Sequence, residues 1–370
     1  MVALLPGRPG RLADVPSFDR AIGGAESNVA CALAAAGHTV RWVSRVGADG
    51  FGDHLLATVA AHGVDVSRVG RDPVRPTGVY FRTAADRATD AHEVAYYRAG
   101  SAASAMSVET VDPAAVRAGR VLHLSGITAA LSEGCLGLLH DLTAPAEGRP
   151  LVSFDVNYRP SLWTWPDGVE VLLELARRAD VVFVGADEAE QAWGVTGGPA
   201  AVRELLPEPG VLVVKEGAKG ATAFQRAGAG GPSGAGAWGL GAPTRRQPHI
   251  EHSPEPLTGR CGRRPFPAAP TPGTFEPAPT VDVVAAVGAG DAFAAGFLSG
   301  TLRGLPVRRS LRLGHLFAAA TLTSPADLAP PPDRDTTDRL TALDAPAWGT
   351  LRLGPGWTRA AAAEEEGRTP

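Results

Sequence analysis

Asp291 follows a turn of small residues, Gly288, Ala289 and Gly290, within the stretch VDVVAAVGAGDAFAAGFLSG. Small residues let successive backbone N–H groups point outward at the start of a helix, where the helix dipole favours negative charge. Such amides suit a phosphoryl group in transfer, and a carboxylate in the first helical turn can accept a proton from a hydroxyl group. A tight turn followed by an ordinary N-terminal helix acid explains the short motif equally well.

This motif differs from the two common nucleotide-binding loops. Phe293 stands where a dinucleotide-binding GxGxxG would have its third glycine, and no GK[ST] follows as in a P-loop. A nicotinamide-dependent dehydrogenase is therefore disfavoured.

A second stretch, VVKEGAKGATAF, leads from an apolar run into Lys215, Gly217, Lys219 and Gly220. Glycine lets a ligand approach the backbone closely, and lysine supplies positive charge near phosphates. A glycine-containing hairpin is the favoured interpretation of this motif in isolation.

A third stretch, SFDVNYRPSLW, places Asn157 and Arg159 just after an apolar run that Pro160 ends. Parallel sheets bind ligands at the carboxyl ends of their strands, and an arginine there suits a carboxylate. The alternative is a surface arginine in a salt bridge.

The composition excludes several classes of protein. The chain has 370 residues, a net charge of −4 and 44% hydrophobic residues, so it has material for a large core and no basic surplus for nucleic acid. No apolar run approaches the roughly 20 residues of a membrane span, and no signal peptide is evident. Cys31, Cys135 and Cys261 are far apart, which is typical of a reduced cytoplasmic protein.

Short β-rich runs alternate with helical patterns between residues 39 and 225. This alternation predicts an α/β fold with a parallel sheet buried on both faces. TGVYFR and HEVAYYR, within residues 77–98, have no helix between them and predict a small antiparallel flap. The predicted strands are 39–46, 77–82, 92–98, 120–126, 151–157, 181–185, 210–217 and 281–285, and the predicted helices are 26–36, 51–62, 132–142, 169–178, 201–206, 291–303 and 307–322.

Two segments lack this regularity. Residues 226–280 are dense in Gly, Pro and Ala without a period of 2 or 3.6, which predicts a mostly disordered insertion. Residues 345–370 are again irregular and predict a loose tail. Residues 1–225 and 281–340 are expected to form the catalytic domain.

The order of the motifs resembles that of the ribokinase-like (PfkB) carbohydrate kinases, over about residues 20–330 without the insertion. The resemblance implies a three-layer α/β/α sandwich with a small antiparallel β flap that acts as a lid. YYRAGSA together with DVNYRPSLW is most similar to the branch acting on 2-keto-3-deoxygluconate. The motifs that carry the resemblance are GGAESNVACALAAAGHTVRWVSRVGADGFGDHL, TGVYFR, VAYYRAGSAAS, HLSGITAALS, FDVNYRPSLW, VVKEGAKGA and VGAGDAFAAGFLSG.

The resemblance also implies a role for each matching residue. Asp291 matches the catalytic base, and Gly288, Ala289 and Gly290 match the anion hole. The matches to ATP-binding residues are Asn157, Lys215, Gly217, Lys219, Gly220, Gly288 and Gly290. The matches to substrate-binding residues are Gly24, Ala25, Glu26, Asn28, Tyr80, Tyr96, Arg98, Ile127, Arg159, Asp291 and Asp327. Glu188 matches a residue that helps to position the metal ion, through water.

The implied activity is ATP-dependent phosphorylation of the terminal hydroxyl of 2-keto-3-deoxygluconate, with Mg²⁺ as cofactor and a cytoplasmic location. Arg98 and Arg159 are two cations suited to a substrate carboxylate, and the tyrosines suit a hydroxylated carbon chain. Fructokinase or another sugar kinase of the family is one alternative. A homo-oligomer formed through the lid is a further expectation.

The sequence departs from the family pattern in ways that favour a second alternative, a binding-only protein. The family's first strand would precede MVALLP, so its absence predicts an unpaired sheet edge or a gap. Ala285 stands in place of an aspartate of the monovalent-cation loop, followed by Ala286. Gly185 replaces the asparagine of an Asn-x-x-Glu element, of which Glu188 remains.

Overall fold

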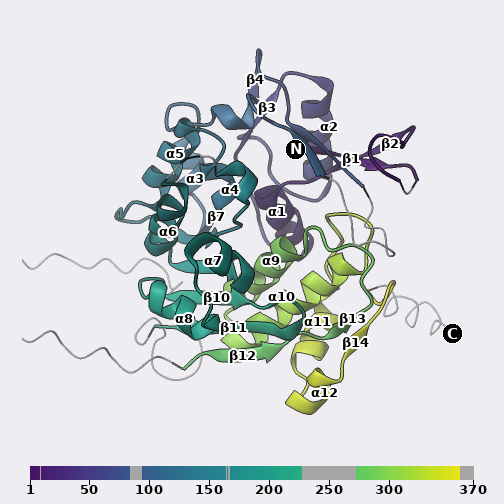
Figure 1. Ribbon diagram of the computed structural model, residues 1–370, viewed down its shortest axis with the longest axis vertical. Coiled ribbons are helices and arrows are strands. Elements are labelled where there is room, and N and C mark those ends of the chain that lie inside the picture. The colour runs from purple at the N-terminus through teal and green to yellow at the C-terminus, as the bar shows by residue number, and fades with distance from the viewer. Residues whose placement is uncertain (9, 84–93, 164, 166, 227–271, 359–370) are drawn as a thin grey trace, which may run out of the picture.

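The computed structural model describes residues 1–8, 10–83, 94–163, 165, 167–226 and 272–358. A six-stranded sheet with the order β12-β11-β10-β9-β8-β7 occupies its centre (Figure 1). Neighbouring strands from β7 to β10 are parallel, whereas β11 is antiparallel to both β10 and β12. The strands are β7 (Val121–Ser125), β8 (Leu151–Asp155), β9 (Val181–Gly185), β10 (Val211–Lys215), β11 (Gly220–Gln225) and β12 (Thr274–Pro277).

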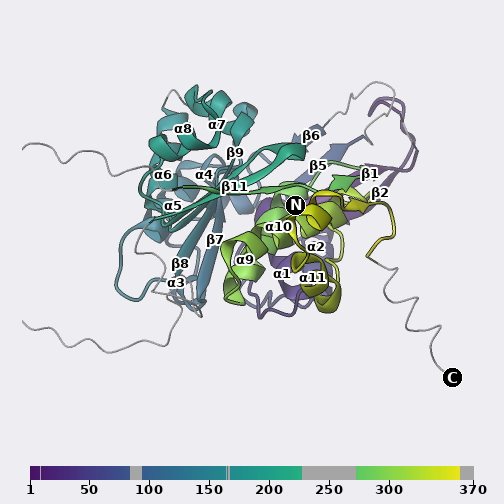
Figure 2. The ribbon, with the colours of Figure 1, turned by 90° about the horizontal axis from the view of Figure 1, so that it is seen from below.

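Side chains alternate between the two faces of this sheet. In β9, Val182 and Val184 enter one hydrophobic core, and Val181 and Phe183 enter the other. Two groups of helices cover these cores from opposite sides (Figure 2). The three-layer α/β/α architecture is therefore confirmed. The helices of the first face are α5 (Glu133–Thr143), α6 (Gly168–Arg178), α7 (Ala186–Trp193) and α8 (Gly198–Leu205), and those of the second are α1 (Ala25–Ala35), α9 (Ala289–Leu302) and α10 (Val307–Leu322).

A second sheet, with the order β2-β1-β5-β6, projects from one side of the body (Figure 2). The predicted flap pair is present, because β5 (Val79–Arg82) and β6 (Val94–Tyr97) are antiparallel. β1 (Val2–Pro6) extends the flap parallel to β5, and β2 (Phe18–Ile22) pairs with β1 antiparallel. We call this four-stranded sheet the lid.

β7 forms an edge of the central sheet, since among the described strands it pairs only with β8. Its other edge faces a large cavity whose wall includes Val40–Val43 and Leu122. Among the described residues, this edge of the central sheet is therefore not covered by another strand. The segment predicted as a strand at 39–46 forms only a bridge at Arg41 and the short β3 (Arg45–Gly47), because no neighbouring described strand lies along the rest of it.

The ends of the predicted irregular segments are ordered. β12 falls within 226–280 and pairs with β11, which satisfies backbone groups on both strands. In the predicted tail, α12 (Ala345–Gly349) and β14 (Arg352–Leu353) form a cap in which Trp348 is fully buried. The apolar burial of this tryptophan stabilises a segment whose local pattern lacks a period. Residues 227–271 and 359–370 lie outside the described residues.

The predicted strand at 281–285 is also shorter than expected. Only β13 (Thr280–Val281) forms, paired in parallel with β14, and Val283 is exposed. The chain from Asp282 to Val287 instead approaches the start of α9 as a loop. The remaining elements are α2 (Gly50–Ala61), β4 (Gly70–Asp72), α3 (Pro113–Arg117), α4 (Gly126–Ala129), α11 (Arg334–Thr341) and the 3-10 turns Ala103–Ala105, Pro160–Leu162 and Gly217–Lys219.

Within the described part of the chain, every helix is too short or too polar to cross a bilayer. Cys31 and Cys135 are buried and free, and Cys261 lies outside the described residues.

Candidate active site

The N-terminus of α9 opens into the large cavity, whose volume is about 900 Å³. Gly288 caps the helix with a φ of 81°, a left-handed conformation that glycine adopts without strain. A Cβ atom at Gly288 would lie 2.0 Å from the carbonyl oxygen of Asp327, so this position has no room for a side chain. Gly288 and Gly290 both line the cavity. Backbone amides at the start of a helix that opens into a cavity can bind an anion.

Asp291 lies in that first turn and lines the same cavity. The side-chain amide of Asn28, on α1, donates a hydrogen bond of 2.8 Å to Asp291 Oδ2. The pKa of Asp291 is raised to about 7, chiefly by burial and also by the nearby carboxylate of Asp155, against the lowering effect of the Asn28 hydrogen bond. A carboxylate with a pKa near neutrality is well matched to general-base catalysis.

Lys215, at the end of β10, faces Asp155, at the end of β8. Its Nζ atom lies 3.2 Å from each carboxylate oxygen of Asp155. Burial disfavours the ammonium group, but the carboxylates of Asp155, Glu188 and Asp291 together hold its pKa above the ordinary value. A permanent positive charge thus lies between the sheet edge and the start of α9.

Arg159 and Glu188 form an ion pair on the other side of Lys215. Arg159 Nη1 lies 3.2 Å from Glu188 Oε1 and also donates to the carbonyl oxygen of Tyr158. Glu188 Oε2 accepts a hydrogen bond from the backbone N–H of Gly185 at the start of α7. Arg159 keeps half of its side chain exposed, which leaves other donors of its guanidinium free to meet a ligand.

Asn157 connects this pair to the sheet. It has a φ of 44°, a positive value that is rare for a residue other than glycine, and its side chain is buried at the cavity wall. Left-handed backbone at a residue other than glycine is strained and is concentrated at functional sites.

The lid contributes aromatic and cationic groups to the opposite wall. Tyr80 and Tyr96 pack with ring centroids 5.7 Å apart, and the guanidinium of Arg98 lies 4.7 Å from the centroid of the Tyr96 ring. In the described part of the chain no carboxylate forms an ion pair with Arg98, and its Nε is buried without a hydrogen-bond partner. Burial lowers the pKa of Arg98, the nearby Tyr96 hydroxyl and Glu26 carboxylate oppose this, and the positive charge of Arg159 adds to the lowering. Both guanidinium groups line the same cavity.

Most of the predicted site residues converge on this one cavity. Those that line it are Gly24, Ala25, Glu26, Asn28, Tyr80, Tyr96, Arg98, Ile127, Asn157, Arg159, Glu188, Lys215, Gly288, Gly290, Asp291 and Asp327. Those outside its lining are Ala289, Gly217, Lys219 and Gly220.

Gly220 has a structural use of its own. Its φ is 140°, and a Cβ atom there would lie 2.3 Å from the carbonyl oxygen of Glu276 in β12. Because glycine has no Cβ atom, β12 can lie close to the backbone at this position. The ATP-binding roles of Gly217, Lys219 and Gly220 remain predictions.

Sequence reasoning missed several polar residues of the cavity. Asp155 is the last residue of β8, two positions before Asn157. Its place at the carboxyl end of a parallel strand, where such sheets bind ligands, is the signal that could have identified it. Thr128 donates a hydrogen bond to Glu26, which is 102 residues away in the sequence, and Arg82 in the lid forms an ion pair with Asp327. Such long-range partners leave no local pattern in a single sequence.

A carboxylate of near-neutral pKa, helix-terminal amides and a buried lysine around one cavity are the parts of a phosphotransferase that acts on alcohol groups. The family model "pfkB family carbohydrate kinase" matches residues 2–235 and 271–334. The chain belongs to that family.

Individual relatives agree with this assignment. The chain is 30% identical over 333 residues to a 2-dehydro-3-deoxygluconokinase of Bacillus subtilis, covering 88% of each protein. A 2-dehydro-3-deoxygluconokinase of Thermoproteus tenax is 36% identical over 231 residues, covering 60% of this chain and 68% of the relative. A 2-dehydro-3-deoxygalactonokinase of Haloferax volcanii is 27% identical over 333 residues, covering 89% of this chain and 90% of the relative. The crystal structure of a PfkB protein from Polaromonas sp. JS666 matches with a TM-score of 0.70 and 30% identity, covering 93% of this chain and 97% of the other.

Proposed function

We propose that the protein is an ATP-dependent 2-keto-3-deoxygluconate kinase. The observation that carries the choice of a sugar acid is the pair of guanidinium groups, Arg98 and Arg159, that line one cavity. No described carboxylate forms an ion pair with Arg98, and the Glu26 carboxylate acts on its pKa without pairing with it, so a substrate carboxylate can supply a direct partner. A neutral hexose would leave this partly buried cation without an ion-pair partner.

In the proposed reaction, the terminal hydroxyl oxygen of the sugar acid attacks the γ-phosphorus of ATP. A bond forms between that oxygen and phosphorus, the bond from phosphorus to the β,γ-bridging oxygen breaks, and ADP leaves. Asp291 Oδ accepts the hydroxyl proton. The backbone amides of Gly288–Gly290 and the ammonium of Lys215 stabilise the negative charge on the transferred group.

Tyr80, Tyr96 and Glu26 are proposed to hold the carbon chain of the sugar. The tyrosine rings offer apolar faces, and the phenol and carboxylate groups offer partners for the hydroxyls. Glu26 lies close enough to Arg98 and to Asp291 to act on the pKa of each, which suits a substrate whose carboxylate and reacting hydroxyl lie at opposite ends. The contact of Ile127 and of Asn28 with the sugar is proposed on the same ground.

The residues present fit Mg²⁺, which binds through one or two carboxylates, several waters and phosphate oxygens. Asp155 and Glu188 both lie close enough to Lys215 to act on its pKa, at the cavity wall. No group of three or more potential metal ligands occurs in the described part of the chain, so a site shared with nucleotide phosphates and water is the arrangement available there. When bound, the ion would neutralise charge on the phosphates.

The first experiment is a measurement of ADP formation with 2-keto-3-deoxygluconate, 2-keto-3-deoxygalactonate, fructose and ribose as acceptors. We expect turnover with the keto-deoxy acids and a much higher KM for the neutral sugars. Comparable kcat/KM for fructose and the acids would contradict the proposed substrate and favour the hexose-kinase alternative. Association through the lid remains a prediction and is tested separately by sedimentation.

A further inference from the structure

A buried ion pair joins the lid to the chain that follows α10. Arg82, the last residue of β5, places Nη2 2.6 Å from Asp327 Oδ1, and only 5% and 4% of the two side chains are exposed. The same Nη2 atom donates a hydrogen bond of 3.0 Å to the carbonyl oxygen of Pro325. Burial of two charges costs solvation free energy, which an ion pair recovers only with good geometry. Arg82 Nε and Asp327 Oδ1 have no hydrogen-bond partner among the described residues, so the lid is held to this segment by a close ion pair that does not recover its whole solvation cost.

The second carboxylate oxygen of Asp327 is also engaged by β5. The hydroxyl of Tyr80 donates a hydrogen bond to Asp327 Oδ2. Tyr80 and Arg82 are two residues apart on one strand, so their side chains leave the same face of the lid. One strand thus holds both oxygens of Asp327, although this residue was expected to contact the substrate.

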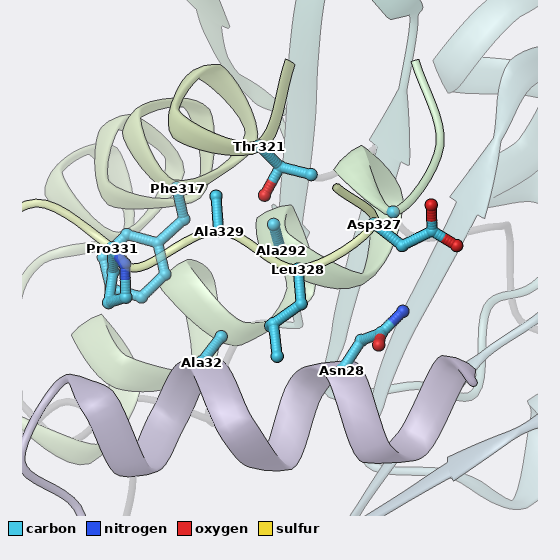
Figure 3. Close-up of a pocket in the computed structure, with 10 residues that line it drawn as sticks. Asn28, Ala32, Ala292, Phe317, Thr321, Asp327, Leu328, Ala329 and Pro331 are labelled. Atoms are coloured by element: carbon cyan, nitrogen blue, oxygen red, sulfur yellow. The ribbon is translucent and has the colours of Figure 1, made fainter. Parts of the chain in front are cut away.

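The main chain of Asp327 lies directly against the anion-binding end of the site. Its carbonyl oxygen occupies the space next to the Cα atom of Gly288, where a Cβ atom would be 2.0 Å away. Figure 3 shows the segment from Asp327 to Pro331 running between α1 and the helices behind it, with Leu328 pointing toward α1. Asn28, which binds Asp291, lies at the same end of this small cavity as Asp327. The backbone of Asp327 and the start of α9 are therefore in direct contact, without space for a side chain between them.

We propose that Arg82 is a positioning residue for phosphoryl transfer. By neutralising and orienting Asp327, it fixes the segment against which Gly288 packs, and so aligns the anion-binding amides with the lid that covers the sugar. The proposal rests on the kinase activity of the family and is independent of which sugar is the substrate. Its assay therefore uses whichever sugar of the panel the wild-type chain phosphorylates best.

The test compares R82M, D327N and the double variant R82M/D327N with the wild type. R82M leaves a buried carboxylate without its cation, D327N leaves a buried cation without its carboxylate, and the double variant leaves neither. The matched control is R45M, which breaks the pair between Arg45 and Asp72, 3.0 Å apart and also largely buried, in the short sheet β3–β4, whose residues do not line the cavity. For each variant, kcat and the KM values for ATP and sugar are measured, together with Tm.

We expect R82M and D327N to lower kcat about 100-fold, since a displacement of about 1 Å at a reacting centre has such an effect, while both KM values change by less than about threefold. The double variant should recover part of kcat, because no unpaired charge then displaces the side chain at position 327. R45M should lower Tm and leave kcat per folded molecule unchanged. If R82M does not fold, R82Q, which also removes the positive charge, and the double variant carry the same comparison.

Three results would overturn the proposal. One is a kcat for R82M within twofold of the wild type at saturating substrates. Another is a loss confined to the KM of the sugar, which would mean that Arg82 or Asp327 acts on the substrate directly. The third is an equal loss of kcat in R45M, which would reduce the effect to general stability.

Discussion

Asn28 and Asp291 are 263 residues apart in the sequence, and the amide of Asn28 donates a 2.8 Å hydrogen bond to Asp291 Oδ2. This contact joins the first turns of α1 and α9, two helices that pack on the same face of the central sheet. A hydrogen bond to the ionised carboxylate lowers its pKa, whereas burial raises it. Asn28 therefore helps to set the pH at which Asp291 can act as a base.

Replacement of Asn28 by leucine removes the donor and keeps the volume of the side chain. The pKa of Asp291 should then rise above its value of about 7, because the effect that lowers it is lost. The acid limb of the kcat/KM–pH profile should move to higher pH. Assays at intervals of roughly 0.3 pH units between about pH 5.5 and 9 would detect the shift. An unchanged limb, within the error of the fit, would mean that Asn28 does not act on Asp291.

Asp291→Asn should lower kcat by about 10²- to 10⁴-fold, the range typical of a lost general base. The wild-type kcat/KM should rise with pH through about 7, since only the ionised carboxylate accepts the proton. The variant should lose this limb and keep its affinity for the sugar, measured by calorimetry. Turnover near that of the wild type would exclude Asp291 as the base.

The same substitution should stabilise the protein at alkaline pH. The folded-state pKa of Asp291 lies above the ordinary value of 3.8, so the folded state binds a proton more tightly than the unfolded state does. The stability of the wild type therefore falls as pH rises from about 4 to about 7 through this one group. Asp291→Asn removes the penalty, so its gain in Tm should be larger at about pH 8 than at about pH 5. An equal change in Tm at both pH values would contradict the raised pKa.

The alternation of apolar runs and helical patterns was sufficient to predict the α/β/α layers. Which face of a strand or helix is buried depends on the spacing of its apolar residues, and this spacing can be seen in a short stretch of sequence. α10 begins and ends where the pattern does, at Val307 and Leu322. The strand β12 was missed because its stability comes from pairing with β11, and Trp348 orders a tail whose local pattern is irregular. Tertiary contacts of this kind override local composition.

The site was predictable to the extent that its residues sit in recognisable motifs. Gly288 and Asp291 come from one short stretch, and the structure places them at a helix start as expected. Asp155 and Arg82, by contrast, have partners far along the chain. Asp155 pairs with Lys215, 60 residues later, and Arg82 in the lid pairs with Asp327, which follows α10. A single sequence carries no signal for such pairs.

The two arginines of the cavity give a test of carboxylate recognition. Arg98→Ala and Arg159→Ala should each raise the KM for 2-keto-3-deoxygluconate by about 10- to 100-fold, as expected for the loss of a hydrogen bond to a charged group, roughly 1.5–3 kcal/mol. Their effect on the KM for fructose should be small, because that sugar has no carboxylate. The surface pair Arg71–Asp53 supplies the control, since Arg71→Ala removes an arginine at an exposed site. Equal effects on both sugars would contradict a carboxylate clamp.

Gly288→Ala should damage both stability and catalysis, for two separable reasons. The φ of 81° is strained for alanine by about 1–2 kcal/mol, and the new Cβ would lie 2.0 Å from the carbonyl oxygen of Asp327, so the helix start or the Asp327 segment must move. Gly304→Ala, just beyond the end of α9, isolates the first effect, because its φ is 70° and nothing lies within 4 Å of its Cβ position. Gly304→Ala should therefore lower Tm by a few degrees and leave kcat unchanged. Gly288→Ala should lower Tm further and reduce kcat about 100-fold at saturating ATP, because the anion-binding amides are displaced. If both variants lose Tm alike and both keep their kcat, the start of α9 does not stabilise the transferred phosphoryl group.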